Sequence, residues 1–368
     1  MAMVEYYRPA TGTAESEAVA DALGSGTLST GEIVEEFESE FADFCGRGQA
    51  AAVASGSVAL EFALSASPLE SGEGVLVSPF NCPAVLYAIV RAGYRPLFAD
   101  IDPTTLALDA DHVNAVLDES NDVAALLLTP SYGLAASFDE LQSVARSRDL
   151  VLITDFCQAP GAIYDGKPVG SYGDVGVCSF GATKNITTGE GGIVVGNDRY
   201  VDYAREARSN AQISSIDRPT SVRMSDIAAT IGRVQLDKYP DLLATRRAAA
   251  DAYRDTLPKE VVPQSLPDVA THVYHRFPVR VEKRATLVSF LDERKIPFSI
   301  EIETPLYEYD ASAGSNVTNG LPGTETAVEE TILLPIHSEI DASDTAAIGD
   351  EISSFYSTGF RRSDPPGS

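Results

Sequence analysis

The chain has 368 residues, 44% of them hydrophobic, and its 54 acidic against 27 basic side chains give a formal net charge of −27. This charge argues against a nucleic-acid partner. The apolar runs fall short of the roughly 20 residues that cross a bilayer, and the start of the chain lacks the basic-then-apolar order of a secretory signal. We therefore expect no membrane partner and a cytoplasmic location.

The acidic residues are dispersed along the chain instead of forming one tail. A solvated acidic surface is the simplest interpretation, and a halophilic source with a high-salt cytoplasm is a further hypothesis, because salt screens the self-repulsion of such a surface. The four cysteines and four histidines show no metal-ligand spacing, so no metal site is predicted.

Short apolar runs alternate with amphipathic segments between residues 48 and 196. In chain order the runs are QAAAVAS, GVLVSPF, RPLFADID, AALLLTP, VLITDF, GVCSF and GGIVVG. Continuous apolar strands separated by helices are typical of a mostly parallel sheet that is covered on both faces. The sequence therefore predicts an α/β fold with a large lobe built on such a sheet.

A second, smaller lobe is predicted after a helical segment at about 200 to 250. There HVYHRFPVRV and ETILLPIH have the character of strands, while ATLVSFLDERKIP and DASDTAAIGDEISSFYS have that of helices. We expect a large domain over 1–240, a small C-terminal α+β domain over 241–360, and a disordered tail over 361–368.

Polar residues follow the predicted strands, and ligands of such sheets gather at the carboxyl ends of the strands. Ser55-Gly56-Ser57 precedes a predicted helix, whose N-terminus would bind an anion, although Ser55 could equally be a simple helix cap. Asp155 ends VLITD, where it would accept a hydrogen bond from a protonated ring nitrogen, or be another helix cap or a surface charge. Gln158, one turn later, would bond a ring substituent or only its own loop.

Lys184 lies in CSFGATKNITTGEGG, between hydroxyl-bearing residues and glycines. The stretch does not fit the phosphate-binding loop of nucleotide hydrolases, because no Ser or Thr follows the lysine. A lysine, a carboxylate and an anion cup at one sheet edge match a cofactor with an aldehyde, a basic ring nitrogen and a phosphate. Pyridoxal 5′-phosphate has all three groups, and a lysine binds it as a Schiff base.

Nearly the whole chain resembles the DegT/DnrJ family of pyridoxal-phosphate-dependent nucleotide-sugar aminotransferases, which have the fold type I architecture. The matching stretches occur in the family's order. They are GTLSTGEIVEEFESEFADFCG, VASGSVALEFAL, RAGYRPLFADIDPTTLALD, ITDFCQAPGAIYDGKPVGSYGDVGVCSF, TKNITTGEGG, SVRMSDIAATIGRVQLDKY, HVYHRFPV and LLPIH.

The resemblance implies a role for each predicted site residue. Lys184 becomes the cofactor-binding lysine and the acid-base group, and Asp155 the partner of the pyridine nitrogen. Gln158 contacts the ring near its phenolic oxygen. Phosphate contacts are implied for Gly56, Ser57 and Ser179, and the turn containing Thr30 lies near the substrate entrance.

Two positions depart from the family pattern. Cys82 occupies the place of the usual aromatic residue that stacks on the cofactor ring, with Phe80 as a possible substitute. Ser221 occupies the place of an asparagine that the neighbouring subunit supplies to the phosphate. Cys82 and Ser221 are therefore the predicted cofactor contacts at these two places, and a homodimer is implied.

Retention of Lys184 favours amino transfer, because related sugar dehydratases carry histidine at this position. The leading hypothesis is transfer of an amino group, with glutamate as the donor that the resemblance implies, to a keto group of a nucleotide-linked sugar in polysaccharide or metabolite synthesis. A keto-cyclitol or another small carbonyl compound is the alternative acceptor. A non-catalytic regulatory protein that binds the cofactor is a third hypothesis.

Overall fold

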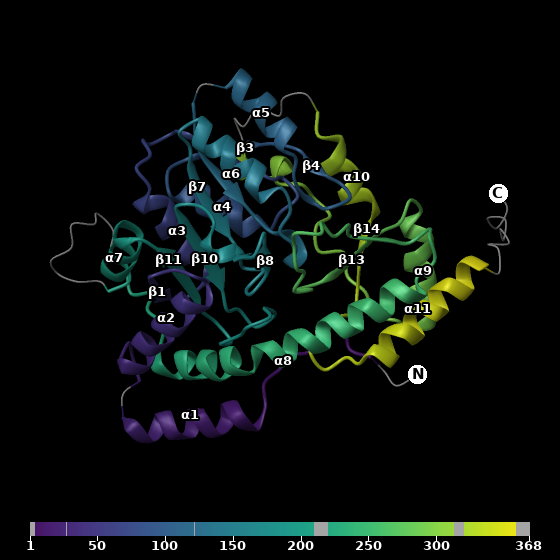
Figure 1. Ribbon diagram of the computed structural model, residues 1–368, viewed down its shortest axis with the longest axis horizontal. Coiled ribbons are helices and arrows are strands. Elements are labelled where there is room, and N and C mark those ends of the chain that lie inside the picture. Colours follow the sequence, from purple (N-terminus) through teal and green to yellow (C-terminus); the bar gives the residue numbers. More distant parts are fainter. Residues whose placement is uncertain (1–3, 27, 121, 210–219, 313–319, 358–368) are drawn as a thin grey trace.

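The computed structural model describes residues 4–26, 28–120, 122–209, 220–312 and 320–357. Its large lobe is built on a seven-stranded sheet with the order β1-β11-β10-β7-β6-β2-β3 (Figure 1). The strands are β1 (Gln49–Val53), β2 (Gly74–Val77), β3 (Arg95–Phe98), β6 (Val123–Leu128), β7 (Val151–Asp155), β10 (Val175–Ser179) and β11 (Gly192–Gly196). The predicted disordered tail, 361–368, lies outside the described residues.

The sheet is mostly parallel, as predicted. Strands β3, β2, β6, β7 and β10 are parallel to one another, whereas β11 runs antiparallel to both β10 and β1. Residues 180–191, which connect β10 to β11, contain no helix, and a parallel return usually runs through a crossover helix. The short connection therefore reverses the chain direction beside the strand end that precedes Lys184.

Helices cover both faces of the sheet because alternate strand residues point to opposite sides. In β1, Ala50 and Ala52 belong to one apolar core and Ala51 and Val53 to the other. One core is closed by α2 (Glu32–Phe44), α5 (Ala110–Glu119) and α6 (Phe138–Ser147), and the other by α3 (Gly56–Ala66), α4 (Pro83–Arg91) and α7 (Asp198–Ala207).

The small lobe has its own core around a three-stranded antiparallel sheet, β12-β13-β14. Its elements are β12 (Val262–Pro263), β13 (Phe277–Arg280), α9 (Arg284–Arg294), α10 (Pro322–Glu330), β14 (Thr331–Leu334) and α11 (Ala342–Ser357). Two short hairpins, β4 (Ile101–Asp102) with β5 (Ala107–Leu108) and β8 (Ile163–Tyr164) with β9 (Lys167–Pro168), complete the strands of the described residues.

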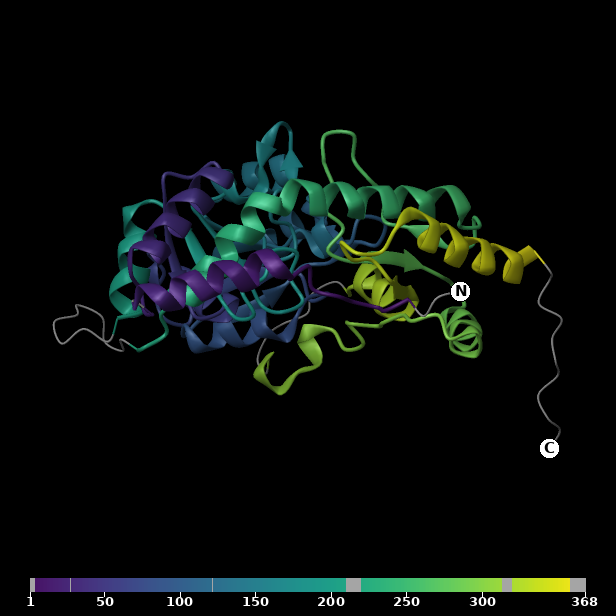
Figure 2. The same cartoon turned by 90° about the horizontal axis from the view of Figure 1, so that it is seen from below.

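One long helix, α8 (Asp226–Thr256), joins the two lobes (Figures 1 and 2). Its Tyr239 and Leu243 lie in a core of the large lobe, whereas Ala249 and Tyr253 lie in the core of the small lobe. Helix α1 (Thr13–Ser25) packs on the first half of α8, and α11 packs on the second half. The expected boundary at residue 240 thus falls inside a continuous helix, and the division into 1–240 and 241–360 stays a prediction.

A search of the described residues for helices of membrane-spanning length and hydropathy finds none. Over the same residues, no group of three or more His, Cys, Asp or Glu side chains is placed to hold a metal ion.

Candidate cofactor site

A cavity of about 220 Å³ lies where β7 and β10 end and where α3 and α4 begin. These positions share one edge of the sheet because the strands β2, β6, β7 and β10 are parallel. Seven of the eight predicted site residues line this cavity, and Ser221 does not. The lining residues are Gly56, Ser57, Leu60, Asn81, Cys82, Ala84, Val85, Thr129, Asp155, Cys157, Gln158, Ser179 and Lys184.

The N-terminus of α3 forms one wall of the cavity. Ser55 caps this helix, since its Oγ accepts the Val58 N–H at 3.3 Å, so the simple capping interpretation is correct for Ser55. Gly56 and Ser57 follow in the first turn, which contains no acidic residue. Unpaired N–H groups and the helix dipole make this end of α3 suited to a phosphate.

Backbone packs very closely around that helix end. A Cβ atom on Gly56 would lie 2.5 Å from the Cβ of Ser179, and one on Gly192 would lie 2.3 Å from the Ser55 carbonyl carbon. The close packing around this helix end therefore requires glycine at both positions. Gly189 differs, since a Cβ there would meet nothing within 4 Å and its φ of +80° is what favours glycine.

Asp155 lies at the end of β7 with only 6% of its surface exposed. Burial raises the pKa of this carboxyl, while hydrogen bonds from the Cys157 thiol and N–H (the latter 3.1 Å) and the charge of Lys184 act in the opposite direction. No ion pair with Asp155 occurs among the described residues. A buried carboxylate in this state suits a ligand with a protonated ring nitrogen.

Gln158 is oriented by a backbone group of another loop. Its Oε1 accepts the Tyr132 N–H at 2.6 Å, so its remaining amide hydrogens are available to the cavity. Tyr132 has a left-handed backbone with φ of +58° and is buried. Because this conformation is unfavourable for a tyrosine, the surrounding packing must hold it.

Lys184 projects from a turn that is anchored on both sides. Its N–H donates to the Gly181 carbonyl at 3.0 Å. The next residue, Asn185, donates through Nδ2 to the Val273 carbonyl at 3.0 Å and lies 3.2 Å from Nδ1 of His275. These bonds tie the turn to residues 273–275, the segment just before β13, so that the lysine is held at the cavity instead of on a free surface loop.

The two departures from the family pattern have different positions in the fold. Cys82 is exposed, lines the cavity and precedes α4. Phe80 is not a lining residue, because it is buried against Tyr132 with a ring-centroid distance of 6.2 Å. It therefore does not replace the missing stacking ring. Ser221 is exposed beside Ser209 and lies outside this cavity.

Six lining residues were not among the predicted site residues, and three of these carry a polar or thiol side chain: Asn81, Thr129 and Cys157. Asn81 donates to Thr129 Oγ1 at 2.9 Å and accepts the Cys82 N–H at 2.8 Å, which fixes the start of α4. Asn81 and Thr129 lie at the ends of apolar runs, so the position that marked Asp155 could also have marked them. Cys157 was not selected because Asp155 and Gln158, on either side of it, were stronger candidates.

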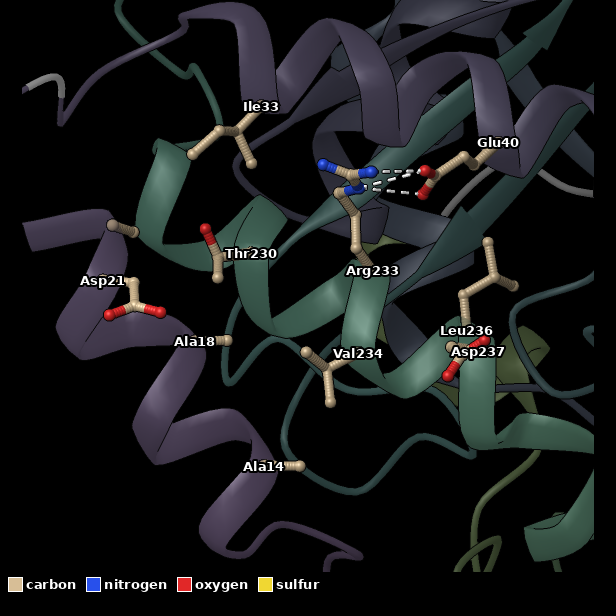
Figure 3. Close-up of a pocket in the computed structure, with 11 residues that line it drawn as sticks. Ala14, Ala18, Asp21, Ile33, Glu40, Thr230, Arg233, Val234, Leu236 and Asp237 are labelled. Atoms are coloured by element: carbon tan, nitrogen blue, oxygen red, sulfur yellow. Dashed lines mark hydrogen bonds and ion pairs between the residues drawn. The ribbon is translucent and has the colours of Figure 1, made fainter. Parts of the chain in front are cut away.

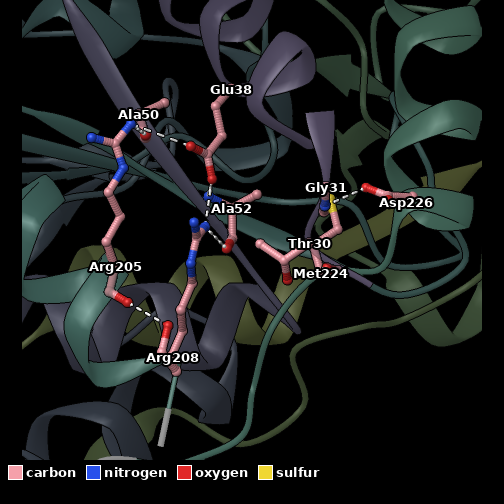
Figure 4. A network of polar contacts seen from close by, with 10 residues as sticks. Thr30, Gly31, Glu38, Ala50, Ala52, Arg205, Arg208, Met224 and Asp226 are labelled. Carbon is pink, nitrogen blue, oxygen red and sulfur yellow. Dashed lines mark hydrogen bonds and ion pairs between the residues drawn. The ribbon is translucent and has the colours of Figure 1, made fainter. Parts of the chain in front are cut away.

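Thr30 lies in a turn that is attached to the start of α8 (Figure 4). Its Oγ1 donates to the Met224 carbonyl at 3.3 Å, and the N–H of Gly31 donates to Asp226 Oδ1 at 2.8 Å. The same figure shows Glu38 bonded to Arg208 beside β1. These contacts attach the turn before α2 to the start of α8, and they attach Glu38 of α2 to Arg208 beside β1, the strand that precedes α3.

A larger hollow, of about 850 Å³, lies between α1, α2 and α8 (Figure 3). Its walls are mainly alanines and branched aliphatic side chains, with Arg233 and Glu40 forming an ion pair of 2.7 Å. It contains none of the predicted site residues. The seven predicted site residues that line a cavity lie in the smaller one, at the strand ends.

Comparison with known proteins gives a consistent result. The model of the DegT/DnrJ/EryC1/StrS aminotransferase family matches residues 9–353. GDP-perosamine synthase of Vibrio cholerae is 30% identical over 83% of this chain and 88% of its own length. A dTDP-4-dehydro-2,3,6-trideoxy-D-glucose 4-aminotransferase of Saccharopolyspora spinosa is 29% identical over 95% and 96%. The crystal structure of the aminotransferase TlmJ from Streptoalloteichus hindustanus superposes with a TM-score of 0.89, at 28% identity over 97% and 99% of the two chains.

Proposed function

Because the chain belongs to the DegT/DnrJ/EryC1/StrS aminotransferase family and is a pyridoxal-phosphate-dependent transaminase, we propose that it transfers an amino group from glutamate to a keto group of a nucleotide-linked sugar. Relatives named for GDP- and dTDP-linked sugars support this acceptor class. A role in polysaccharide biosynthesis is supported by a 27% identical relative, the spore coat polysaccharide biosynthesis protein SpsC of Bacillus subtilis.

The convergence of Asp155, Lys184 and the α3 N-terminus on one cavity is the observation that carries the proposal. Asp155 would accept a hydrogen bond from the ring nitrogen, and the first turn of α3 would hold the phosphate together with the hydroxyls of Ser57 and Ser179. When bound, pyridoxal phosphate supplies an electron sink that makes the hydrogen on the amine-bearing carbon acidic.

Lys184 first holds the cofactor and then acts as the proton carrier. Its Nζ removes the proton from the amine-bearing carbon of the donor and returns a proton during amination of the acceptor. The Nε2 of Gln158 would donate to the phenolic oxygen of the cofactor, since the Oε1 of Gln158 accepts the Tyr132 N–H. Because Asp155 is buried, water would be kept away from the ring nitrogen, and the interaction between the carboxylate and that nitrogen would be stronger.

The direct experiment is reconstitution of the purified protein with pyridoxal phosphate. We expect a visible absorption band that borohydride removes while leaving the cofactor covalently attached. Lys184→Ala should abolish this attachment, with Lys167→Ala as a control lysine on a surface hairpin. Attachment that persists in the Lys184→Ala protein would show that another residue binds the aldehyde.

A substrate panel then tests the acceptor. It contains keto-sugar nucleotides and keto-cyclitols, each with glutamate as donor, because the residues at the cavity do not distinguish the two acceptor classes. Turnover of the cyclitols alone would overturn the nucleotide-sugar assignment.

We further propose a cytoplasmic homodimer in which Ser221 serves the partner's phosphate site. The exposure of Ser221 and its position outside the cavity of its own chain support this arrangement. Mixing Lys184→Ala chains with Ser221→Pro chains should restore part of the activity, because one of the two mixed sites is then intact. Equal inactivity of the mixture and of its components would argue against a shared site.

A further inference from the structure

Four side chains from three distant parts of the chain meet at the junction between the lobes. They are Tyr6, Tyr7, Arg276 and Glu301, here called the Arg276 cluster. The Arg276 guanidinium carbon lies 5.9 Å from the ring centroid of Tyr6 and 5.7 Å from that of Tyr7, and its Nε donates to Glu301 Oε1. The Arg276 side chain is 8% exposed and that of Glu301 is 31% exposed. The carboxylate is thus the accessible partner of a buried guanidinium.

The cluster is adjacent to the turn that carries Lys184. The Tyr7 hydroxyl donates to the carbonyl of Ala182, two residues before the lysine. Figure 2 shows the segment that precedes α1 running from that helix toward the small lobe. The N-terminal segment therefore places Tyr7 in contact with both Arg276 and the turn that carries Lys184.

Backbone contacts also connect the cluster to the ring side of the cavity. The N–H of Arg276 donates to the Tyr132 carbonyl at 3.3 Å, and the N–H of the same Tyr132 holds Gln158. Arg276 Nη1 further donates to the carbonyl of His275 at 3.0 Å. The backbone of Arg276 is thus linked through Tyr132 to Gln158, and its guanidinium is held by the His275 carbonyl.

This corner gathers positive charge in a strongly acidic protein. His275 is buried, and burial together with the charges of Arg276, Lys184 and Arg246 holds its pKa well below the ordinary histidine value. Burial likewise lowers the pKa of Arg246 to about 10. A positive site within a protein of net charge −27 attracts an anionic ligand to this side of the cavity.

We propose that Arg276 binds a carboxylate group of the amino donor, and that Glu301 is an internal carboxylate which pairs with Arg276 until the donor displaces it. The inference rests on the proposed function, because the donor is that of a transaminase. Exchange of one carboxylate for another never leaves the buried guanidinium unpaired, which would be costly. A neutral sugar ring cannot make this exchange, so the pair distinguishes the donor from the sugar portion of the acceptor.

Equilibrium binding of glutarate tests this proposal without turnover. Glutarate has two carboxylates and no amine, and its binding to the cofactor-loaded protein is measured by calorimetry. Arg276→Gln should weaken binding by about ten- to a hundredfold, the range for a hydrogen bond to a charged group. Glu301→Gln should strengthen binding several-fold, because the competing carboxylate is gone.

The opposite signs separate ligand binding from a purely structural pair. If Arg276 and Glu301 only stabilise the fold, the two substitutions will weaken binding together or leave it unchanged, and either result overturns the proposal. Arg280→Gln is the matched control, since Arg280 pairs with Glu330 at 3.3 Å in the same lobe, and it should leave binding unchanged. If Arg276→Gln does not fold, Arg276→Lys and the Glu301→Gln gain still test the assignment.

Single-turnover kinetics with glutamate and alanine identify the carboxylate. Arg276→Gln should raise the KM for the donor and leave acceptor binding unchanged. If the variant is defective with both donors, Arg276 binds the α-carboxylate of the donor. If it is defective with glutamate alone, Arg276 binds the side-chain carboxylate. A wild-type protein that transfers amines from neither donor, yet binds glutarate with the expected variant pattern, refutes the proposed function but supports this site. Normal glutarate binding by Arg276→Gln refutes the site and leaves the proposed function intact.

Discussion

Asp155→Asn isolates the charge at the floor of the cavity. Asparagine has nearly the same shape, and its Oδ1 still accepts the Cys157 N–H that now lies 3.1 Å from the carboxylate. What changes is the ability to stabilise a positive ring nitrogen. A hydrogen bond between charged groups contributes about 1.5–3 kcal/mol, which corresponds to a fall in kcat of roughly ten- to a hundredfold.

The same substitution should have the opposite effect on the protein without cofactor. Burial raises the pKa of Asp155, so folding favours its protonated form. The stability contribution is fully present below the ordinary pKa of aspartate and is lost as the pH rises through the raised value. At neutral pH the cofactor-free Asp155→Asn protein should therefore unfold at a higher temperature than the wild type, and the difference should vanish in acid.

Thermal unfolding with and without pyridoxal phosphate, over a range of pH, measures both effects. Asp174→Asn is the control, because Asp174 accepts the Leu152 N–H at 2.8 Å at the other end of the same strand. It should not alter cofactor binding. A cofactor-free Asp155→Asn protein that is less stable than the wild type, together with unchanged turnover, would refute the assignment of Asp155 and indicate a purely structural carboxylate.

Three further predictions concern the cup, the core and the solvent. Gly192→Ala places a Cβ 2.3 Å from the Ser55 carbonyl carbon and should weaken phosphate binding at least tenfold in an equilibrium titration. Gly181→Ala is the control, because the nearest atom to its new Cβ, Ser179 Oγ, is 3.7 Å away, and this variant should bind phosphate normally. Equal defects in the two variants would contradict the close packing around the α3 N-terminus. Glu38→Gln breaks the buried ion pair with Arg208 and should lower the free energy of unfolding by about 3–5 kcal/mol in denaturant titrations. A loss below about 1 kcal/mol, which is typical of exposed ion pairs, would show that the Glu38–Arg208 pair does not behave as a buried one. Raising the salt concentration should raise the melting temperature, because the net charge of −27 is screened, and a temperature independent of salt would refute this self-repulsion.

The cavity residues were predictable because a local pattern marks them. Asp155 and Ser179 each end an apolar run, and parallel strands bring such ends to one edge without further information. Phe80 shows the limit of the pattern. It also follows a strand and is aromatic, but packing against Tyr132 buries it away from the cavity. Which side of a strand end faces a ligand depends on neighbours that are remote in sequence.

The amino-acid sequence by itself determined the α/β class, the mostly parallel sheet, and the lysine, carboxylate and helix end that line the candidate cofactor site, because periodicity and residue type act locally. The tertiary structure alone decided the orientation of Gln158. Its Oε1 accepts the N–H of Tyr132, a residue with a strained backbone that lies 26 positions earlier in the chain. The tertiary structure also decided the pairing of Arg276 with Glu301 between the rings of Tyr6 and Tyr7. These contacts join segments that only the packing of the two lobes brings together, so no local pattern contains them.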